Sequence, residues 1–153
     1  MVIPHLDDPK ERGGRMMVPF HLALTVRNLE ETRRFYTRVL RATEGRSAPT
    51  WVDFSLYGHQ LSLHQSPEGG ATFHNGVDGD AVPIPHFGVV LPWDEWHSLR
   101  DHIATKQVPF VLGPRIRFEN QPGEQATFFI RDPSGNALEF KSFKDPERLF
   151  AST

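Results

Sequence analysis

Residues 19–40, PFHLALTVRNLEETRRFYTRVL, combine the pattern of a strand with the periodicity of an amphipathic helix. Residues 20–26 form an apolar run of the kind that predicts a strand. Asn28, followed three residues later by Glu31, has the pattern of a capping box, which marks the start of a helix. The apolar residues that follow fall on one helical face: Leu29, Phe35, Tyr36, Val39 and Leu40. This stretch therefore predicts a strand followed directly by an amphipathic helix.

The same pattern begins again at residues 85–91, PHFGVVL, where Asp94 opens a second predicted helix. The inward face of that helix would carry Trp96, Leu99 and Ile103. His21 and His86 both stand second in their strands, and Gly58 and Gly135 both stand in predicted hairpin turns. The chain therefore reads as a tandem repeat of two β-α-β-β-β units, neither of which could close a core alone.

The remaining strands are predicted from alternation and from turn residues. In the first unit, residues 51–57 and 60–64 form a hairpin around Gly58. In the second unit we expect strands near residues 108–112 and at 125–131 and 137–143. The predicted organisation is a loose leader at 1–17, a first module at 18–65, a linker at 66–84, a second module at 85–145 and a tail at 146–153.

The composition argues against several classes of function. The chain has 153 residues, 17 Lys and Arg against 19 Asp and Glu, and no cysteine. Because acidic and basic residues are nearly equal in number, the composition does not favour binding to nucleic acid. No apolar run approaches the length of a membrane span. We expect a cytoplasmic protein with a small-molecule substrate. Without cysteine, any metal must be held by nitrogen and oxygen, which draws attention to the eight histidines.

Strand parity places His21, His86 and Glu139 on the sheet faces that turn away from the helices. Two neutral imidazoles and one carboxylate suit Fe(II) or a similar divalent ion and leave coordination positions open. A carboxylate between Leu138 and Phe140 is also costly to bury unless it is paired or bound to a metal. These three residues are the predicted metal ligands. Fe(II) is favoured, and Mn(II), Ni(II), Co(II) and Zn(II) are the alternatives.

Three further residues are candidates for roles around that ion. Aligning the turns puts Ser62, and not His64, at the place of Glu139, so His64 lies one step along the same face. It could act as a catalytic acid and base or as a fourth ligand. Arg117 and Gln125 flank the longer connection of the second unit and could bind an anionic substrate, although a solvated edge strand explains them as well.

The residues PFHLALTVRNLEETRRFYTRVL, PHFGVVL and ATFFIRDPSGNALEF resemble the vicinal oxygen chelate superfamily over about residues 18–143. This superfamily holds glyoxalase I, extradiol dioxygenases, and fosfomycin- and bleomycin-resistance proteins. The resemblance implies an α+β fold in which two βαβββ modules form an open, curved, cup-like mixed sheet with the helices outside. It maps the metal ligands onto His21, His86 and Glu139, and it implies a homodimer in which modules pair within or between chains.

The chain looks most like the small extradiol-dioxygenase-like members. Our first hypothesis is therefore an Fe(II) oxygenase that cleaves a catechol-like aromatic with dioxygen, with His64 moving a proton. A non-redox glyoxalase-like isomerase or transferase is the first alternative, although a carboxylate would be the usual fourth ligand where only His64 is available here. The second alternative is a metal-free binding protein of the resistance type.

Overall fold

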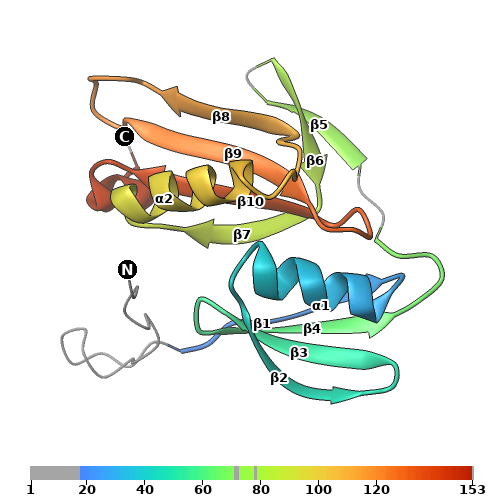
Figure 1. Ribbon diagram of the computed structural model, residues 1–153. Helices are drawn as coiled ribbons and strands as arrows, with labels where there is room; N and C mark the ends of the chain where they lie inside the picture. Colours follow the sequence, from blue (N-terminus) through green and yellow to red (C-terminus); the bar gives the residue numbers. More distant parts are fainter. Residues whose placement is uncertain (1–17, 71–72, 78, 153) are drawn as a thin grey trace. The chain divides into compact units, whose positions relative to one another are not determined.

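The computed structural model describes residues 18–70, 73–77 and 79–152, and it divides the chain into two compact units, residues 1–68 and 69–153. The predicted leader at residues 1–17 lies outside the described part. Each unit contains a four-stranded mixed sheet with a helix on one face (Figure 1). Neither sheet closes on itself, so the α+β fold with two tandem βαβββ modules is confirmed.

The first unit consists of β1 (His21–Val26), α1 (Leu29–Arg38), β2 (Thr43–Ala48), β3 (Trp51–Leu56) and β4 (His59–Gln65). Its strands lie in the order β1-β4-β3-β2, with β1 parallel to β4 and the other pairs antiparallel. The side chain of Asn28 accepts a hydrogen bond of 2.9 Å from the backbone N–H of Glu31, as the capping pattern predicts. The predicted apolar helix face is buried.

The second unit repeats this topology with β7 (His86–Val90), α2 (Trp93–Ala104), β8 (Leu112–Arg117), β9 (Gln125–Arg131) and β10 (Ala137–Phe143). Its sheet order is β7-β10-β9-β8, again with the first pair parallel. The Asp132 carboxylate closes the β9–β10 turn by accepting the backbone N–H groups of Ser134 and Asn136, both at 2.9 Å. The internal repeat is thus confirmed strand by strand.

Three segments differ from the expectation. β8 begins at Leu112 and not near residue 108, because the apolar residues before it pack as a loop, with the Phe110 ring edge-on to Phe128 at 5.3 Å. The segment expected as a linker folds into a hairpin, β5 (Phe73–Val77) and β6 (Asp80–Ile84), which belongs to the second unit. A short 3₁₀ helix, η2 (Pro146–Phe150), lies within the expected tail.

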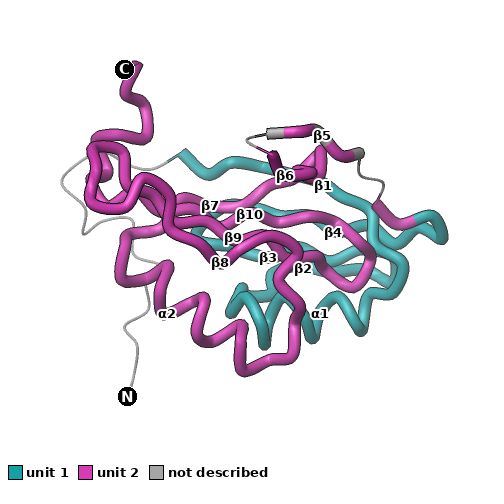
Figure 2. Tube along the Cα trace, turned by 90° about the horizontal axis from the view of Figure 1, so that it is seen from above, with its two compact units in different colours: residues 1–68 teal, residues 69–153 magenta. Residues whose placement is uncertain are grey.

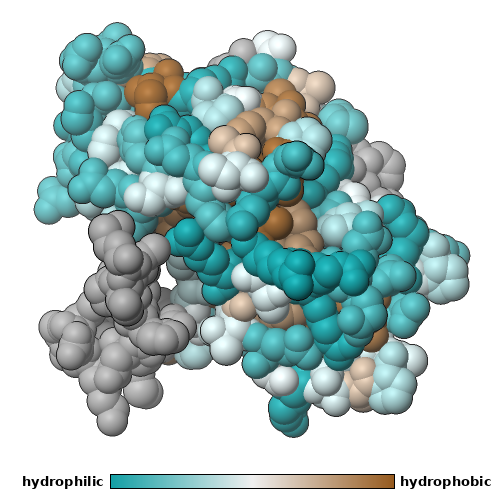
Figure 3. Space-filling view, viewed as in Figure 1, coloured by the Kyte–Doolittle hydropathy of each residue, from teal (hydrophilic) through white to brown (hydrophobic). Residues whose placement is uncertain are grey.

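The helix-facing side of each sheet forms the core of its unit. In the first unit, Val26, Val52 and Leu63 are fully buried there, and in the second unit Trp96 and Phe140 are. The Trp96 indole N–H donates to the Phe140 carbonyl at 2.9 Å, which ties α2 to β10. Hydrophilic residues cover most of the side seen in Figure 3, with apolar patches between them. Within the described residues, no helix is long and apolar enough to cross a membrane.

Candidate metal centre

His86 and Glu139 meet on the face of the second sheet that α2 leaves uncovered. His86 pairs with Ala137 across the parallel β7–β10 ladder, and Glu139 pairs with Gly88, so both side chains leave the sheet on the same side. The Nε2 atom of His86 lies 3.1 Å from Oε2 of Glu139, and the two side chains are 25% and 14% exposed. The structure therefore brings together two of the three predicted ligands.

The orientation of the His86 ring is fixed by the β6 backbone. Its Nδ1 atom lies 2.7 Å from the carbonyl oxygen of Pro83. Because a carbonyl can only accept, Nδ1 carries the proton, and in the neutral ring Nε2 is left with its lone pair toward Glu139. The Phe129 ring packs edge-on against the imidazole, with ring centres 5.0 Å apart. In metal sites, a ligating histidine is commonly oriented by a bond from its other ring N–H to a carbonyl, as Nδ1 of His86 makes here to Pro83.

The Glu139 carboxylate is held from its other oxygen. The Thr127 hydroxyl of β9 donates to Oε1 at 2.8 Å, and the ammonium group of Lys141 lies 4.0 Å from the same atom. Thr127 is buried, with 7% of its surface exposed. Because both contacts use Oε1, the other carboxylate oxygen, Oε2, is the one that faces His86.

This donor pair fits a divalent cation. Two acceptor atoms at 3.1 Å repel one another unless a proton or a cation lies between them. Metal bonds of about 2.1 Å to nitrogen and oxygen, at a right angle, would place the two donors about 3 Å apart. No group of three or more histidine, cysteine, aspartate or glutamate side chains suited to a metal ion occurs among the residues described. His21, the third predicted ligand, belongs to the first unit.

His21 is the first residue of β1, and its side chain lies on the sheet face away from α1, as predicted. It is exposed and pairs with Gln60 in the β1–β4 ladder. His64 lies on the same face, paired with Thr25 and with Trp51, and the Trp51 and His64 rings are tilted with centres 6.4 Å apart. Both histidines belong to the first unit, and His86 and Glu139 belong to the second.

Arg117 and Gln125, the predicted anion-binding residues, are direct cross-strand partners in the β8–β9 ladder. They share the Glu139 face of the sheet, but Gln125 lies four residues before Phe129, the β9 partner of Glu139. That separation is about 13 Å along the strand. The Arg117 guanidinium lies over the Phe118 ring at 5.3 Å. The structure thus brings these two residues to each other and leaves them at a distance from the His86–Glu139 pair.

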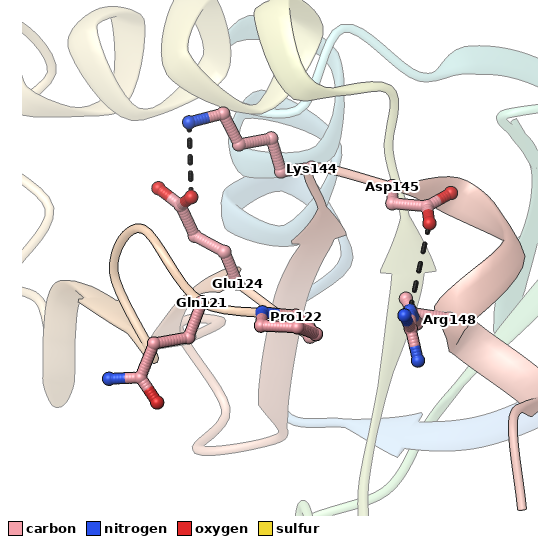
Figure 4. A pocket seen from close by; sticks show the side chains of 7 residues that line it. Gln121, Pro122, Glu124, Lys144, Asp145 and Arg148 are labelled. Carbon is pink, nitrogen blue, oxygen red and sulfur yellow. Dashed lines mark hydrogen bonds and ion pairs between the residues drawn. The ribbon is translucent and has the colours of Figure 1, made fainter. Parts of the chain in front are cut away.

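A separate pocket of about 230 Å³ lies between the β8–β9 loop and η2. Its charges are paired within it: Lys144 with Glu124 at 3.0 Å, and Arg148 with Asp145 at 3.7 Å. Figure 4 shows both pairs, with the Glu124 side chain directed at Lys144. Because its cations are already neutralised, this pocket offers less to a charged substrate than the His86–Glu139 pair does.

Three groups at the site were not identified from the sequence: the Pro83 carbonyl, Thr127 and Phe129. Thr127 is the one hydroxyl in the apolar run ATFFI, and that could have marked it. Phe129 is buried, but the β9–β10 register places it opposite Glu139 and therefore on the site's face. The Pro83 carbonyl left no signal, because a backbone acceptor depends on the hairpin and not on a residue type.

The family model of the glyoxalase/bleomycin resistance protein/dioxygenase superfamily matches residues 19–140. The match includes both repeats and the candidate ligands, and it agrees with the resemblance inferred from the three sequence motifs. The chain belongs to this superfamily.

Solved structures of this superfamily share the fold. A glyoxalase/bleomycin resistance protein/dioxygenase from Alicyclobacillus acidocaldarius is 28% identical, with a TM-score of 0.69 over 97% of this chain and 100% of that one. The fosfomycin resistance protein FosX from Listeria monocytogenes is 17% identical, with a TM-score of 0.66 over 88% and 100%. A lactoylglutathione lyase from Agrobacterium tumefaciens is 20% identical, with a TM-score of 0.61 over 91% and 99%.

Proposed function

We propose that this chain is a divalent-metal-dependent enzyme in which His86, Glu139 and His21 hold the ion. The observation that carries the proposal is the 3.1 Å approach of His86 Nε2 to Glu139 Oε2, with the imidazole tautomer set by the Pro83 carbonyl. His21 is included because it begins β1 as His86 begins β7, on the corresponding face. It would come from the same chain or from a second copy in a homodimer.

The donor set favours Fe(II), which would supply redox chemistry with dioxygen to a substrate that has two adjacent oxygens. Around that site the chain's own groups have defined tasks. Thr127 orients Glu139, and Pro83 orients His86. The Phe129 ring covers one side of the imidazole and limits its contact with water. His64, on the corresponding face of the first unit, would take the proton from a catechol hydroxyl. The proposed reaction is the extradiol cleavage of a catechol-like aromatic.

The test is anaerobic reconstitution of the full chain with Fe(II), followed by dioxygen uptake over a panel of catechols. We expect uptake with the wild-type protein and none with His86→Ala or Glu139→Gln. The matched control is His97→Ala, because His97 lies on α2 with its Nδ1 2.8 Å from the Trp93 carbonyl and takes no part in the site. A protein that binds Fe(II) but consumes no dioxygen with any catechol would exclude the oxygenase.

A non-redox transferase or isomerase is the second candidate, favoured by the cationic groups on the site's face. Lys141 lies beside Glu139, and Arg117 on β8 lies on the same side of the sheet. Cations there suit an anionic substrate, such as the phosphonate of fosfomycin or the carboxylates of a glutathione adduct. This candidate predicts turnover with Mn(II), Ni(II), Co(II) or Zn(II) in the absence of dioxygen. Full ligand affinity after His21→Ala, His86→Ala and Glu139→Ala would instead indicate a metal-free binding protein.

The source of His21 can be tested separately. Size-exclusion chromatography with light scattering gives the oligomeric state. If two copies share the site, mixing a His21→Ala chain with a Glu139→Gln chain should restore part of the metal binding that each lacks alone. A stable monomer that binds the metal fully would show that one chain supplies all three ligands.

A further inference from the structure

The β5–β6 hairpin has no counterpart in the βαβββ repeat, since it lies between β4 of the first repeat and β7 of the second. It belongs to the second unit, and Figure 2 shows it on the side of that unit's sheet opposite α2. This is the face that carries His86 and Glu139. The hairpin is therefore a separate two-stranded sheet added to the second unit, on the side of the candidate metal centre.

One ion pair ties β6 to the far edge of the sheet. The carboxylate of Asp80, the first residue of β6, bonds the guanidinium of Arg115 on β8. Both groups are partly shielded from solvent, with side-chain exposures of 22% and 41%. Arg115 pairs with Thr127 in the β8–β9 ladder and so projects on the face of the metal centre. The ion pair therefore fixes the start of β6 against the sheet.

Three residues after Asp80, the same strand reaches the candidate ligand. The Pro83 carbonyl accepts from Nδ1 of His86 at 2.7 Å, and Pro83 itself is buried. A second contact between the hairpin and the sheet is longer: His74 Nε2 lies 3.5 Å from the Arg131 guanidinium, at the limit of a hydrogen bond. The Asp80–Arg115 ion pair therefore ties β6 to β8 three residues before the carbonyl that His86 contacts.

We propose that the Asp80–Arg115 ion pair is a positioning device for His86. It holds β6 so that the Pro83 carbonyl meets Nδ1, keeps the proton on that atom and leaves Nε2 directed at Glu139. Asp80 and Arg115 touch neither ligand, so they act through the hairpin backbone. The inference rests on the proposed function, because it assigns these two residues to the geometry of the same metal centre.

The experiment measures the equilibrium affinity of the full chain for Co(II), by competition with a chromophoric chelator. The single variants are Asp80→Asn and Arg115→Gln, and the charge-exchanged variant carries both Asp80→Arg and Arg115→Asp. Loss of an outer partner of a ligating histidine costs about 10- to 100-fold in metal affinity, and we expect that loss in each single variant. The exchanged pair should recover most of the affinity. The matched control is Asp101→Asn, which breaks the exposed pair with Arg100 on α2 of the same unit.

A second measurement separates positioning from a general loss of structure. Long-range ¹H–¹⁵N spectra of the metal-free protein at alkaline pH report which imidazole nitrogen of His86 carries the proton. We expect the Nδ1–H form in the wild type and in Asp101→Asn, and a mixture of both tautomers in Asp80→Asn and Arg115→Gln. Circular dichroism should show that all variants keep the fold.

Unchanged Co(II) affinity in both single variants, or an unchanged His86 tautomer in both, would overturn the inference. A wild-type chain that does not bind Co(II) would instead overturn the proposed function, and the tautomer measurement would still decide whether the ion pair positions His86. The two failures can therefore be told apart.

Discussion

Ser62 holds the register position in the first sheet that Glu139 holds in the second. Ser62 pairs with Ala23, the third residue of β1, and Glu139 pairs with Gly88, the third residue of β7. Where the second unit has a carboxylate, the first unit has a hydroxyl, which donates to Oδ1 of Asp53 at 2.6 Å. Under the proposed function, Glu139 therefore has no direct counterpart as a ligand in β4.

The Ser62–Asp53 bond leads to a stability prediction. Asp53 is 7% exposed, and its other contacts are longer, at 3.3 Å to the Gln60 amide and 3.7 Å to the Arg46 guanidinium. Ser62→Ala removes the closest donor of a buried carboxylate, so we expect the free energy of unfolding to fall by about 1–3 kcal/mol. Urea denaturation measures the change. Ser47→Ala, at an exposed position of β2, should stay within about 0.5 kcal/mol of the wild type. Equal losses in both variants would contradict the prediction.

Gly88 gives a second stability prediction. A Cβ atom at this position would meet the backbone carbonyl of Glu139, and a backbone atom cannot yield as a flexible side chain does. Gly88→Ala should therefore push β7 away from β10 and cost at least about 1–3 kcal/mol, with a lower Tm in calorimetry. Gly76→Ala is the matched control, because a Cβ on Gly76 in β5 meets nothing within 4 Å. A Gly88→Ala protein as stable as the Gly76→Ala protein would refute the clash.

The elements that could be predicted from the sequence are those with one apolar face. β9 and β10 were predicted with their observed bounds, because Phe128, Leu138 and Phe140 must be buried against α2. β2 has the sequence TEGRSA, and all but one of its residues are exposed, so no alternation marks it. The hairpin at residues 73–84 was not expected either, since its Gly- and Asp-rich surroundings are equally typical of a linker.

The candidate site also has parts that could be predicted from the sequence and parts that could not. Parity along β7 and β10 was enough to place His86 and Glu139 on one face, because side-chain direction in a strand depends only on position. What orients these side chains could not be predicted. Thr127 contacts Glu139 through a diagonal across the β9–β10 register, and the Pro83 carbonyl contacts His86 through an added hairpin. Both depend on pairings that residue types do not encode.

His64 gives a kinetic prediction that follows from the proposed oxygenase. It is exposed on the face of the first sheet that also carries His21. As a proton acceptor it should contribute about 10²- to 10⁴-fold to turnover. His64→Ala should therefore lower kcat by that range in dioxygen-uptake assays and leave the Co(II) affinity unchanged. A parallel loss of Co(II) affinity would show instead that His64 is a ligand.

The last prediction concerns the hydroxyl that holds Glu139. Thr127 is 7% exposed, and Thr127→Val keeps the shape of this buried side chain. The substitution removes the hydroxyl that donates to Oε1 of Glu139 at 2.8 Å. The carboxylate can then turn Oε2 away from His86, so we expect Co(II) affinity to fall about 10- to 100-fold, measured by chelator competition. Thr127→Ser should retain it. Ser62→Ala is the control, because it breaks the corresponding hydroxyl–carboxylate bond in the unit without Glu139. Wild-type affinity in Thr127→Val would show that the hydroxyl does not orient the ligand.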